Sequence, residues 1–115
     1  MIQDGHVVLF RIPQADQAIG KLRPALVIRR LPGPYDDWLI CMISSQVSRH
    51  ISGFDEIIEE GTADFKQSGL KTSSVIKIGR LAVVERTILI GTIGSIGSER
   101  LNLIKNRLSN WISGT

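Results

Sequence analysis

Arg23 is the side chain in this sequence whose type and setting best suit chemistry. Lys21 and Arg23 close a polar stretch, and Pro24 then opens an apolar run that continues to Ile28. Proline disfavours helical backbone in the residue before it, so we expect Arg23 to be extended at the boundary between a loop and a strand. A guanidinium is planar and can donate two parallel hydrogen bonds to the oxygens of a phosphate. From the residues alone, Arg23 is either a solvated loop cation or a held functional group.

The two histidines are the only other side chains that titrate near neutral pH without help. His6 can serve as an acid or a base, or it can be a polar residue at the start of a strand. His50 falls in a loop where nothing in the sequence fixes its neighbours. Two histidines and a single cysteine, without a Cys-x-x-Cys pair, predict no structural metal site.

Composition limits the classes of protein to which the chain can belong. A length of 115 residues fits one domain, and 43% apolar residues are too many for a disordered chain. The net charge of +3 and the pI near 9.4 permit an anionic partner if the charge is concentrated on one surface. No apolar run reaches the roughly 18 residues of a membrane helix. The lone Cys41 lies within an apolar run, which predicts a buried, inert thiol and a reducing cytoplasm.

Short apolar runs separated by turn residues predict the elements that must position these side chains. We expect strands over residues 6–12, 24–30, 37–44, 54–59, 74–81 and 87–96. The run at 38–43 is nearly continuous, which is typical of a central strand covered on both faces. In the fifth strand, Lys77 and Gly79 should face one way and Arg80 the other, with a bend after Leu81.

Helical signals are clear in two places, and the polar segment from Ser44 to Gly53 is expected to be a loop, with or without a short helical turn. Residues 62–67 are expected to form one turn, with Thr62 as its N-cap and Gly69 as its stop. From Ser98, a predicted N-cap, an amphipathic helix begins whose apolar stripe packs on the strands: Leu101, Ile104, Leu108, Trp111 and Ile112. Strands closed by one helix predict a mostly β fold, a small antiparallel barrel.

Four segments, in order, resemble the PemK/MazF family of toxins from type II toxin–antitoxin systems. Lys-x-Arg-Pro-Ala-Leu-Val at 21–27 is the first, and Ile-Ser-Ser-Gln at 43–46 resembles the strand end Ile-Thr-Ser. Ser-Gly-Leu-x-x-x-Ser-Val at 68–75 is the third, and Gly-x-Ile at 94–96 before the helix is the fourth. No single segment is specific, but four in order within one short chain are.

The resemblance implies an SH3-like barrel, usually a homodimer, that cleaves single-stranded RNA without a metal or any other cofactor. It also implies a cognate antitoxin protein as partner and no association with a membrane. RNA cleavage by transesterification uses the substrate 2′-hydroxyl as nucleophile. The protein must align that hydroxyl, move two protons and stabilise charge on the phosphorane.

By this resemblance, Arg23 and Ser44 are the catalytic candidates. Arg23 would stabilise the phosphorane and could donate a proton to the leaving 5′-oxygen. Ser44 occupies a position that is commonly threonine, and its hydroxyl can hydrogen-bond a phosphate oxygen or the attacking 2′-hydroxyl, or simply satisfy the strand end. The residues expected to bind RNA are Lys21, Ser45, Gln46, Lys77, Arg80 and His6. Phosphate contacts of this kind supply affinity rather than sequence choice.

Two positions depart from the family pattern. Some members carry Arg-x-Asp in the fifth strand, and here Lys77 keeps a cation while Gly79 stands in place of the Asp. His6 stands where the family usually has Asp. These departures leave open a non-catalytic toxin that binds a protein target such as DNA gyrase, and a family member whose catalysis has decayed.

Overall fold

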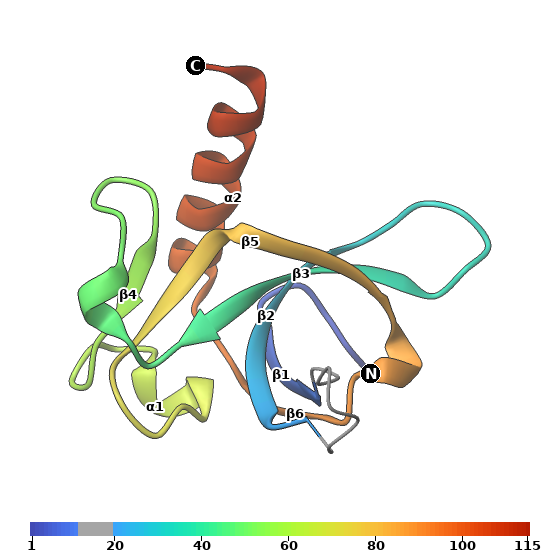
Figure 1. The fold of residues 1–115 in the computed structure, drawn as a ribbon, viewed down its shortest axis with the longest axis horizontal. Coiled ribbons are helices and arrows are strands. Elements are labelled where there is room, and N and C mark those ends of the chain that lie inside the picture. Colours follow the sequence, from blue (N-terminus) through green and yellow to red (C-terminus); the bar gives the residue numbers. More distant parts are fainter. Residues whose placement is uncertain (12–19) are drawn as a thin grey trace.

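In the computed structural model, six antiparallel strands form one curled sheet in the order β4-β5-β3-β2-β1-β6 (Figure 1). The structure describes residues 1–11 and 20–115. The strands are β1 (His6–Arg11), β2 (Leu22–Arg30), β3 (Asp37–Ser44), β4 (Glu56–Ile58), β5 (Ser74–Glu85) and β6 (Gly91–Ser95). The helices are α1 (Phe65–Ser68) and α2 (Ser98–Ser113), with short 3₁₀ turns η1 (Val47–Arg49) and η2 (Arg86–Ile88). The predicted fold class, a mostly β barrel-like sheet with a C-terminal helix, is confirmed as an open half-barrel.

The sheet buries side chains on both of its faces, which explains the nearly continuous apolar runs of its central strands. On the face that α2 covers, Leu26 and Cys41 pack with Ile104 of the helix. On the opposite face, Val27 and Ile40 pack in a second core. Side chains alternate between the two faces of a strand. A strand that is buried on both faces therefore has a continuous run of apolar residues rather than alternating apolar and polar residues. The predicted strand over 37–44 is confirmed with these bounds.

β2 begins two residues earlier than predicted, which places Arg23 inside the strand. The ladder between β1 and β2 extends to the pair Arg11–Leu22, so the chain before Pro24 is already held by hydrogen bonds to its neighbour. Ile12, the predicted end of the first strand, and loop residues 13–19 lie outside the described residues.

β5 bends earlier than the sequence predicted, and this changes which side chains share a face. Met42 pairs with Lys77 while Cys41 pairs with Leu81, so residues 78–80 bulge out of the ladder. Figure 1 shows β5 turning sharply at its middle. An unpaired stretch shifts the alternation of the strand. As a result, Arg80 lies beside Lys77 on one pocket wall, and the predicted opposite facing of these two residues is wrong.

Three elements begin at residues other than those predicted. Thr62 does not cap α1, because its hydroxyl donates to the carbonyl oxygen of Glu59 (2.7 Å) and Asp64 holds the N-cap position. Gly97, not Ser98, holds the N-cap position of α2. The predicted strand over 87–96 starts as η2 and becomes β6 only at Gly91. The stop at Gly69 is confirmed, with φ of +75°. The fourth strand shortens to Glu56–Ile58.

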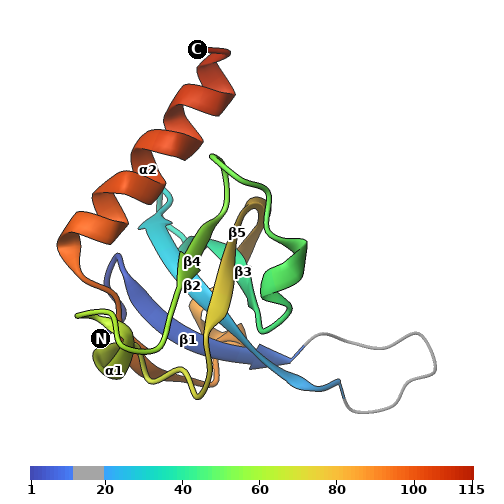
Figure 2. The same cartoon turned by 90° about the vertical axis from the view of Figure 1, so that its left-hand side faces the viewer.

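Helix α2 crosses the sheet and continues past it (Figure 2). Ile104 and Leu108 are buried, whereas Trp111 and Ile112 in the last turn are 58% and 67% exposed. The predicted packing of the whole stripe is therefore wrong for its C-terminal end. Trp111 instead meets the ring of Phe54, with ring centroids 5.7 Å apart. Neither helix in the described part of the chain has the length and apolar character that a membrane crossing requires.

Gly94 is expected to tolerate no side chain. A Cβ at this position would overlap the carbonyl oxygens of Gln67 and Ser68, where β6 passes α1. Gly94→Ala should lower the free energy of unfolding by about 1–3 kcal/mol, because the two elements must separate. Gly91→Ala is the matched control, since a Cβ there meets nothing within 4 Å. Urea denaturation of both variants measures the difference, and equal stabilities would contradict the packing described.

Asp64 should make the stability of the fold fall in acid. Hydrogen bonds from the Arg100 guanidinium hold the pKa of the Asp64 carboxyl below its ordinary value of 3.8, against the opposing effect of burial. A lowered pKa in the folded state contributes stability that is present above pH 3.8 and lost as pH falls through the folded pKa. Urea denaturation between pH 6 and pH 2.5 should show this loss in the wild type and a flatter profile in Asp64→Asn.

Candidate functional site

A pocket of about 370 Å³ lies where β3 ends and β5 begins. Its walls come from the end of β3, the loop with η1, and the two sides of the β5 bulge. The lining residues are Met42, Ser44, Gln46, Arg49, Val75, Lys77 and Arg80. Three of these are cations, and no described residue in the lining is Asp or Glu. The pocket therefore presents hydrogen-bond donors and positive charge to its contents.

Four of the eight predicted site residues meet in this pocket. Ser44 and Gln46 enter from the end of β3, while Lys77 and Arg80 enter from β5. Arg49 of η1 completes the set and was missed, because a loop arginine carries no signal of its direction. The β5 bulge brings Arg80 to the pocket, and the position of this bulge cannot be read from the sequence alone.

Ser44 is oriented by the turn that follows it. Its Oγ accepts a hydrogen bond from the backbone N–H of Gln46 (3.1 Å). A hydroxyl has one donor and two acceptor positions, so this bond leaves the O–H proton for a second partner. The side chain thus satisfies the strand end and keeps its O–H donor, and the catalytic role of Ser44 stays a prediction.

Lys77 is held in place by a carboxylate that sequence analysis did not single out. Its Nζ lies 2.6 Å from Oδ2 of Asp55, whose side chain is only 1% exposed. The same Nζ donates to the carbonyl oxygen of Arg49 (3.1 Å). Lys77 is therefore a fixed pocket donor rather than a mobile surface cation.

Arg23 projects from the sheet face that carries the pocket. Ala25 pairs with Met42, and Met42 pairs with Lys77, so all three side chains share one face. Alternation along β2 puts Arg23, two residues before Ala25, on that same face. The ladder between β2 and β3 ends at the pair Ala25–Met42, so Arg23 lies two residues beyond its last pair. Arg23 is exposed and is not among the residues that line the pocket.

The remaining predicted site residues do not reach the pocket. Lys21 and Ser45 are exposed, and neither lines the pocket, although Ser45 lies between two lining residues in the chain. His6 lies at the other end of the sheet, where it pairs with Ser95 of β6. Its Nδ1 accepts a hydrogen bond from the backbone N–H of Gln3 (3.2 Å). The structure thus places His6 as the polar start of a strand.

Position 79 does not face the pocket in this structure. A Cβ added to Gly79 would lie 3.1 Å from Cε2 of Phe54. A side chain here would point at the Phe54 ring, and Gly79 is not among the pocket residues. A carboxylate at this position would accordingly not enter the pocket on the present backbone. The charged group that does stand behind the pocket wall is Asp55.

Cys41 lies on the helix-covered face and is fully buried. Burial raises the pKa of its thiol to about 12, and the nearby Asp55 charge adds to the effect. A thiol with such a pKa stays protonated at neutral pH and is a poor nucleophile. The prediction of a buried cysteine is confirmed.

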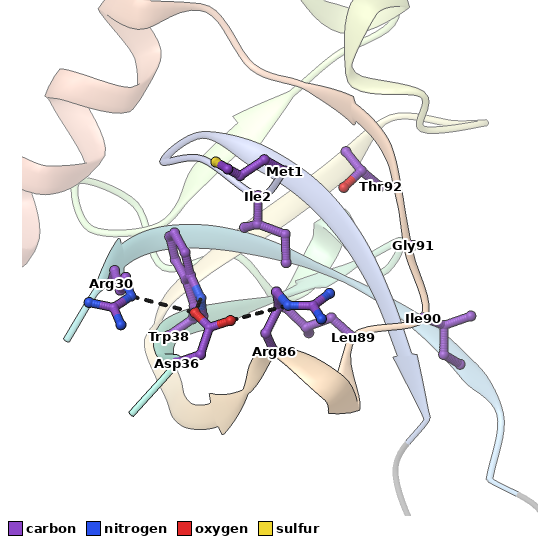
Figure 3. A pocket seen from close by; sticks show the side chains of 10 residues that line it. All are labelled: Met1, Ile2, Arg30, Asp36, Trp38, Arg86, Leu89, Ile90, Gly91 and Thr92. Atoms are coloured by element: carbon purple, nitrogen blue, oxygen red, sulfur yellow. Dashed lines mark hydrogen bonds and ion pairs between the residues drawn. The ribbon is translucent and has the colours of Figure 1, made fainter. Parts of the chain in front are cut away.

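A larger pocket, of about 870 Å³, lies at the other end of the sheet (Figure 3). In this pocket the Asp36 carboxylate forms ion pairs with two arginines. Its Oδ1 lies 3.5 Å from Nε of Arg30, and its Oδ2 lies 3.1 Å from Nε of Arg86. The Nε1 of Trp38 donates to the same carboxylate (2.8 Å), and the Trp38 side chain is buried in the core. None of the eight predicted site residues lines this pocket.

Comparisons with known proteins agree on one family. Residues 3–112 match the family model described as PemK-like, MazF-like toxin of type II toxin–antitoxin system. Among solved structures, Mycobacterium tuberculosis toxin MazF-mt6 superposes with a TM-score of 0.65 and 15% identity, covering 94% of this chain and 96% of the other. MazE-MazF from Deinococcus radiodurans gives a TM-score of 0.70 and 19% identity, covering 100% and 99%. No curated protein sequence matches the chain.

The family match spans nearly the whole chain, and the structural likenesses extend over the full fold at low identity. The resemblance seen in the four sequence segments is thereby confirmed. The chain belongs to the PemK-like, MazF-like toxin family of type II toxin–antitoxin systems.

Proposed function

We propose that this chain is a sequence-specific, metal-independent endoribonuclease that cleaves single-stranded RNA in the cytoplasm as the toxin of its toxin–antitoxin pair. One observation carries the proposal: a hydroxyl, an amide and three cations converge on one pocket, on the sheet face that also bears Arg23. A pocket lined by donors suits the anionic phosphate of an RNA backbone.

In this mechanism the RNA 2′-hydroxyl attacks the adjacent phosphorus, and the bond to the 5′-oxygen breaks. The products are a 2′,3′-cyclic phosphate and a 5′-hydroxyl end. The 2′-hydroxyl gives up its proton to solvent water as it attacks. Arg23 stabilises the charge on the phosphorane and donates a proton to the leaving 5′-oxygen, and it regains that proton from solvent. The Ser44 hydroxyl holds a phosphate oxygen or the attacking hydroxyl in line. Lys77, Arg80 and Gln46 hold the backbone.

Ser44 variants test this assignment of roles. Ser44→Ala should lower the rate of cleavage of a mixed-sequence RNA in EDTA by about 10²-fold, because the aligned hydrogen bond is lost. Ser44→Thr keeps the hydroxyl and should retain activity. Fragment ends, mapped by sequencing, should fall at a short consensus shared by the wild type and Ser44→Thr. Equal rates for the alanine and threonine variants would remove Ser44 from the mechanism.

Partners follow from the same proposal. The toxin is expected to form a homodimer and to be silenced by a cognate antitoxin that lies over the basic pocket. The MazE-MazF likeness supports a protein partner of this class. Co-expression with the cognate antitoxin should restore growth that the toxin alone inhibits.

A second candidate function is binding without cleavage, to a protein target such as DNA gyrase. The observation that favours it is the pocket lining, in which no described residue is a carboxylate or a histidine that could serve as a general base. Folded protein that leaves every RNA intact, beside a family member that cuts in the same buffer, would favour this candidate.

A further inference from the structure

Asp55 is a buried carboxylate fixed from several sides, directly behind the pocket wall. Its Oδ2 accepts from the backbone N–H of Ile51 (2.9 Å) and from Lys77 Nζ (2.6 Å). Its backbone carbonyl accepts from Arg107 of α2 (2.9 Å), and its own N–H donates to the carbonyl of Ile51 (2.9 Å). A carboxylate anchored in this way holds its partner in one place.

Lys77 has one N–H to spare after these contacts are counted. An ammonium carries three donors. Asp55 and the carbonyl oxygen of Arg49 take two of them among the described residues. The side chain is 18% exposed and lines the pocket, so the third N–H is available to a ligand there.

The pairing also changes what Lys77 offers to an anion. The Asp55 charge offsets that of Lys77, so the pair contributes little to long-range attraction. Arg49 and Arg80, both exposed, supply that attraction instead. Lys77 is left as a directed, short-range donor, and an ammonium in an ion pair has no lone pair with which to act as a base.

We propose that Asp55 is a positioning residue that aims the third N–H of Lys77 at a phosphate oxygen of the RNA bound beside Ser44. The inference rests on the proposed function, since it deepens the role of the same pocket. Lys77 contacts the phosphate, and Asp55 acts only through Lys77.

A double-mutant cycle tests this division of roles. Asp55→Asn keeps the shape of the side chain and should lower kcat for a short RNA substrate by about 10²-fold, with KM changed far less, because the donor is misplaced. In a Lys77→Met background, Asp55→Asn should cause no further loss of kcat. Additive losses would indicate that Asp55 does not act through Lys77 and would overturn the inference.

A spectroscopic measurement on the unaltered protein covers the case in which Asp55→Asn fails to fold. The Lys77 ammonium should give a distinct ¹⁵N signal, protected from exchange by its two bonds. That signal should shift when a 2′-O-methyl RNA oligonucleotide, which cannot be cleaved, is added. A Lys77 signal unmoved by saturating RNA would overturn the inference.

The two proposals fail in different ways. Suppose that the wild type binds the oligonucleotide but never cleaves RNA, and that binding shifts the Lys77 signal in the wild type and not in Asp55→Asn. This result would contradict the proposed function and leave the positioning by Asp55 supported. If the wild type cleaves RNA and Asp55→Asn has the same kcat as the wild type, the positioning role alone is contradicted.

Discussion

Arg23→Ala is expected to lower kcat for RNA cleavage by about 10²–10³-fold, because one preorganised charge on the phosphorane is lost. Arg23 stands on β2 on the pocket face, and the ladder to Phe10 holds its backbone. Pro24 fixes the next residue, so the guanidinium is presented from a rigid strand. KM should rise much less than kcat falls, since Arg49, Lys77 and Arg80 still hold the backbone.

Arg29→Ala is the matched control for this prediction. Arg29 lies on the same strand and is also exposed, but it lines a different pocket, with Leu39 and Asp4. The control removes one positive charge without touching the candidate site, so it should keep kcat. Similar losses in both variants would indicate that net charge alone matters, and that Arg23 has no special role.

Arg100→Met is expected to lower the free energy of unfolding by about 3–5 kcal/mol, because it leaves the buried Asp64 carboxylate without its cation and removes one of the two arginines that bind Glu56. The Arg100 side chain is 14% exposed, and those of Asp64 and Glu56 are 11% and 17% exposed. Its guanidinium makes two bonds to Asp64 (2.8 and 2.9 Å) and one to Glu56 (2.8 Å). It also donates to the carbonyl oxygen of Ile57 (2.9 Å). This network joins α2 to β4 and α1.

Arg86→Met provides the comparison for an exposed pair. Arg86 and its partner Asp36 are both more than half exposed, and solvent screens such a pair strongly. We expect no measurable loss of stability from this variant in urea denaturation. If Arg100→Met proves as harmless as Arg86→Met, the network does not hold the helix to the sheet.

Much of the fold was predictable because apolar runs and turn residues are local signals. The run at 38–43 sits between a Pro-Gly turn and a polar break, and β3 has the predicted bounds. Gly69 ended α1 as expected, since a backbone with φ of +75° favours glycine. The bulge at 78–80 was not predictable, because it depends on how β5 pairs with β3 along the whole ladder.

The candidate site was predictable only where residues sit next to a recognisable strand end. Ser44 is the last residue of β3 and Gln46 lies just after it, and both line the pocket. Asp55 could not be identified from the sequence because its role depends on Lys77. The two residues lie far apart in the chain and form their ion pair only in the folded protein. The family pattern indicates a missing carboxylate at Gly79, but only the fold reveals that this position faces Phe54.

The chemistry of the RNA ends tests the central claim most directly. Wild-type protein would be incubated in EDTA with an RNA that carries one mapped cleavage site, and the products analysed by mass spectrometry. We predict a 2′,3′-cyclic phosphate on one fragment and a 5′-hydroxyl on the other, with no cleavage when a 2′-deoxynucleotide replaces the residue before the cut. A 5′-phosphate end, or continued cleavage of the 2′-deoxy substrate, would contradict the account.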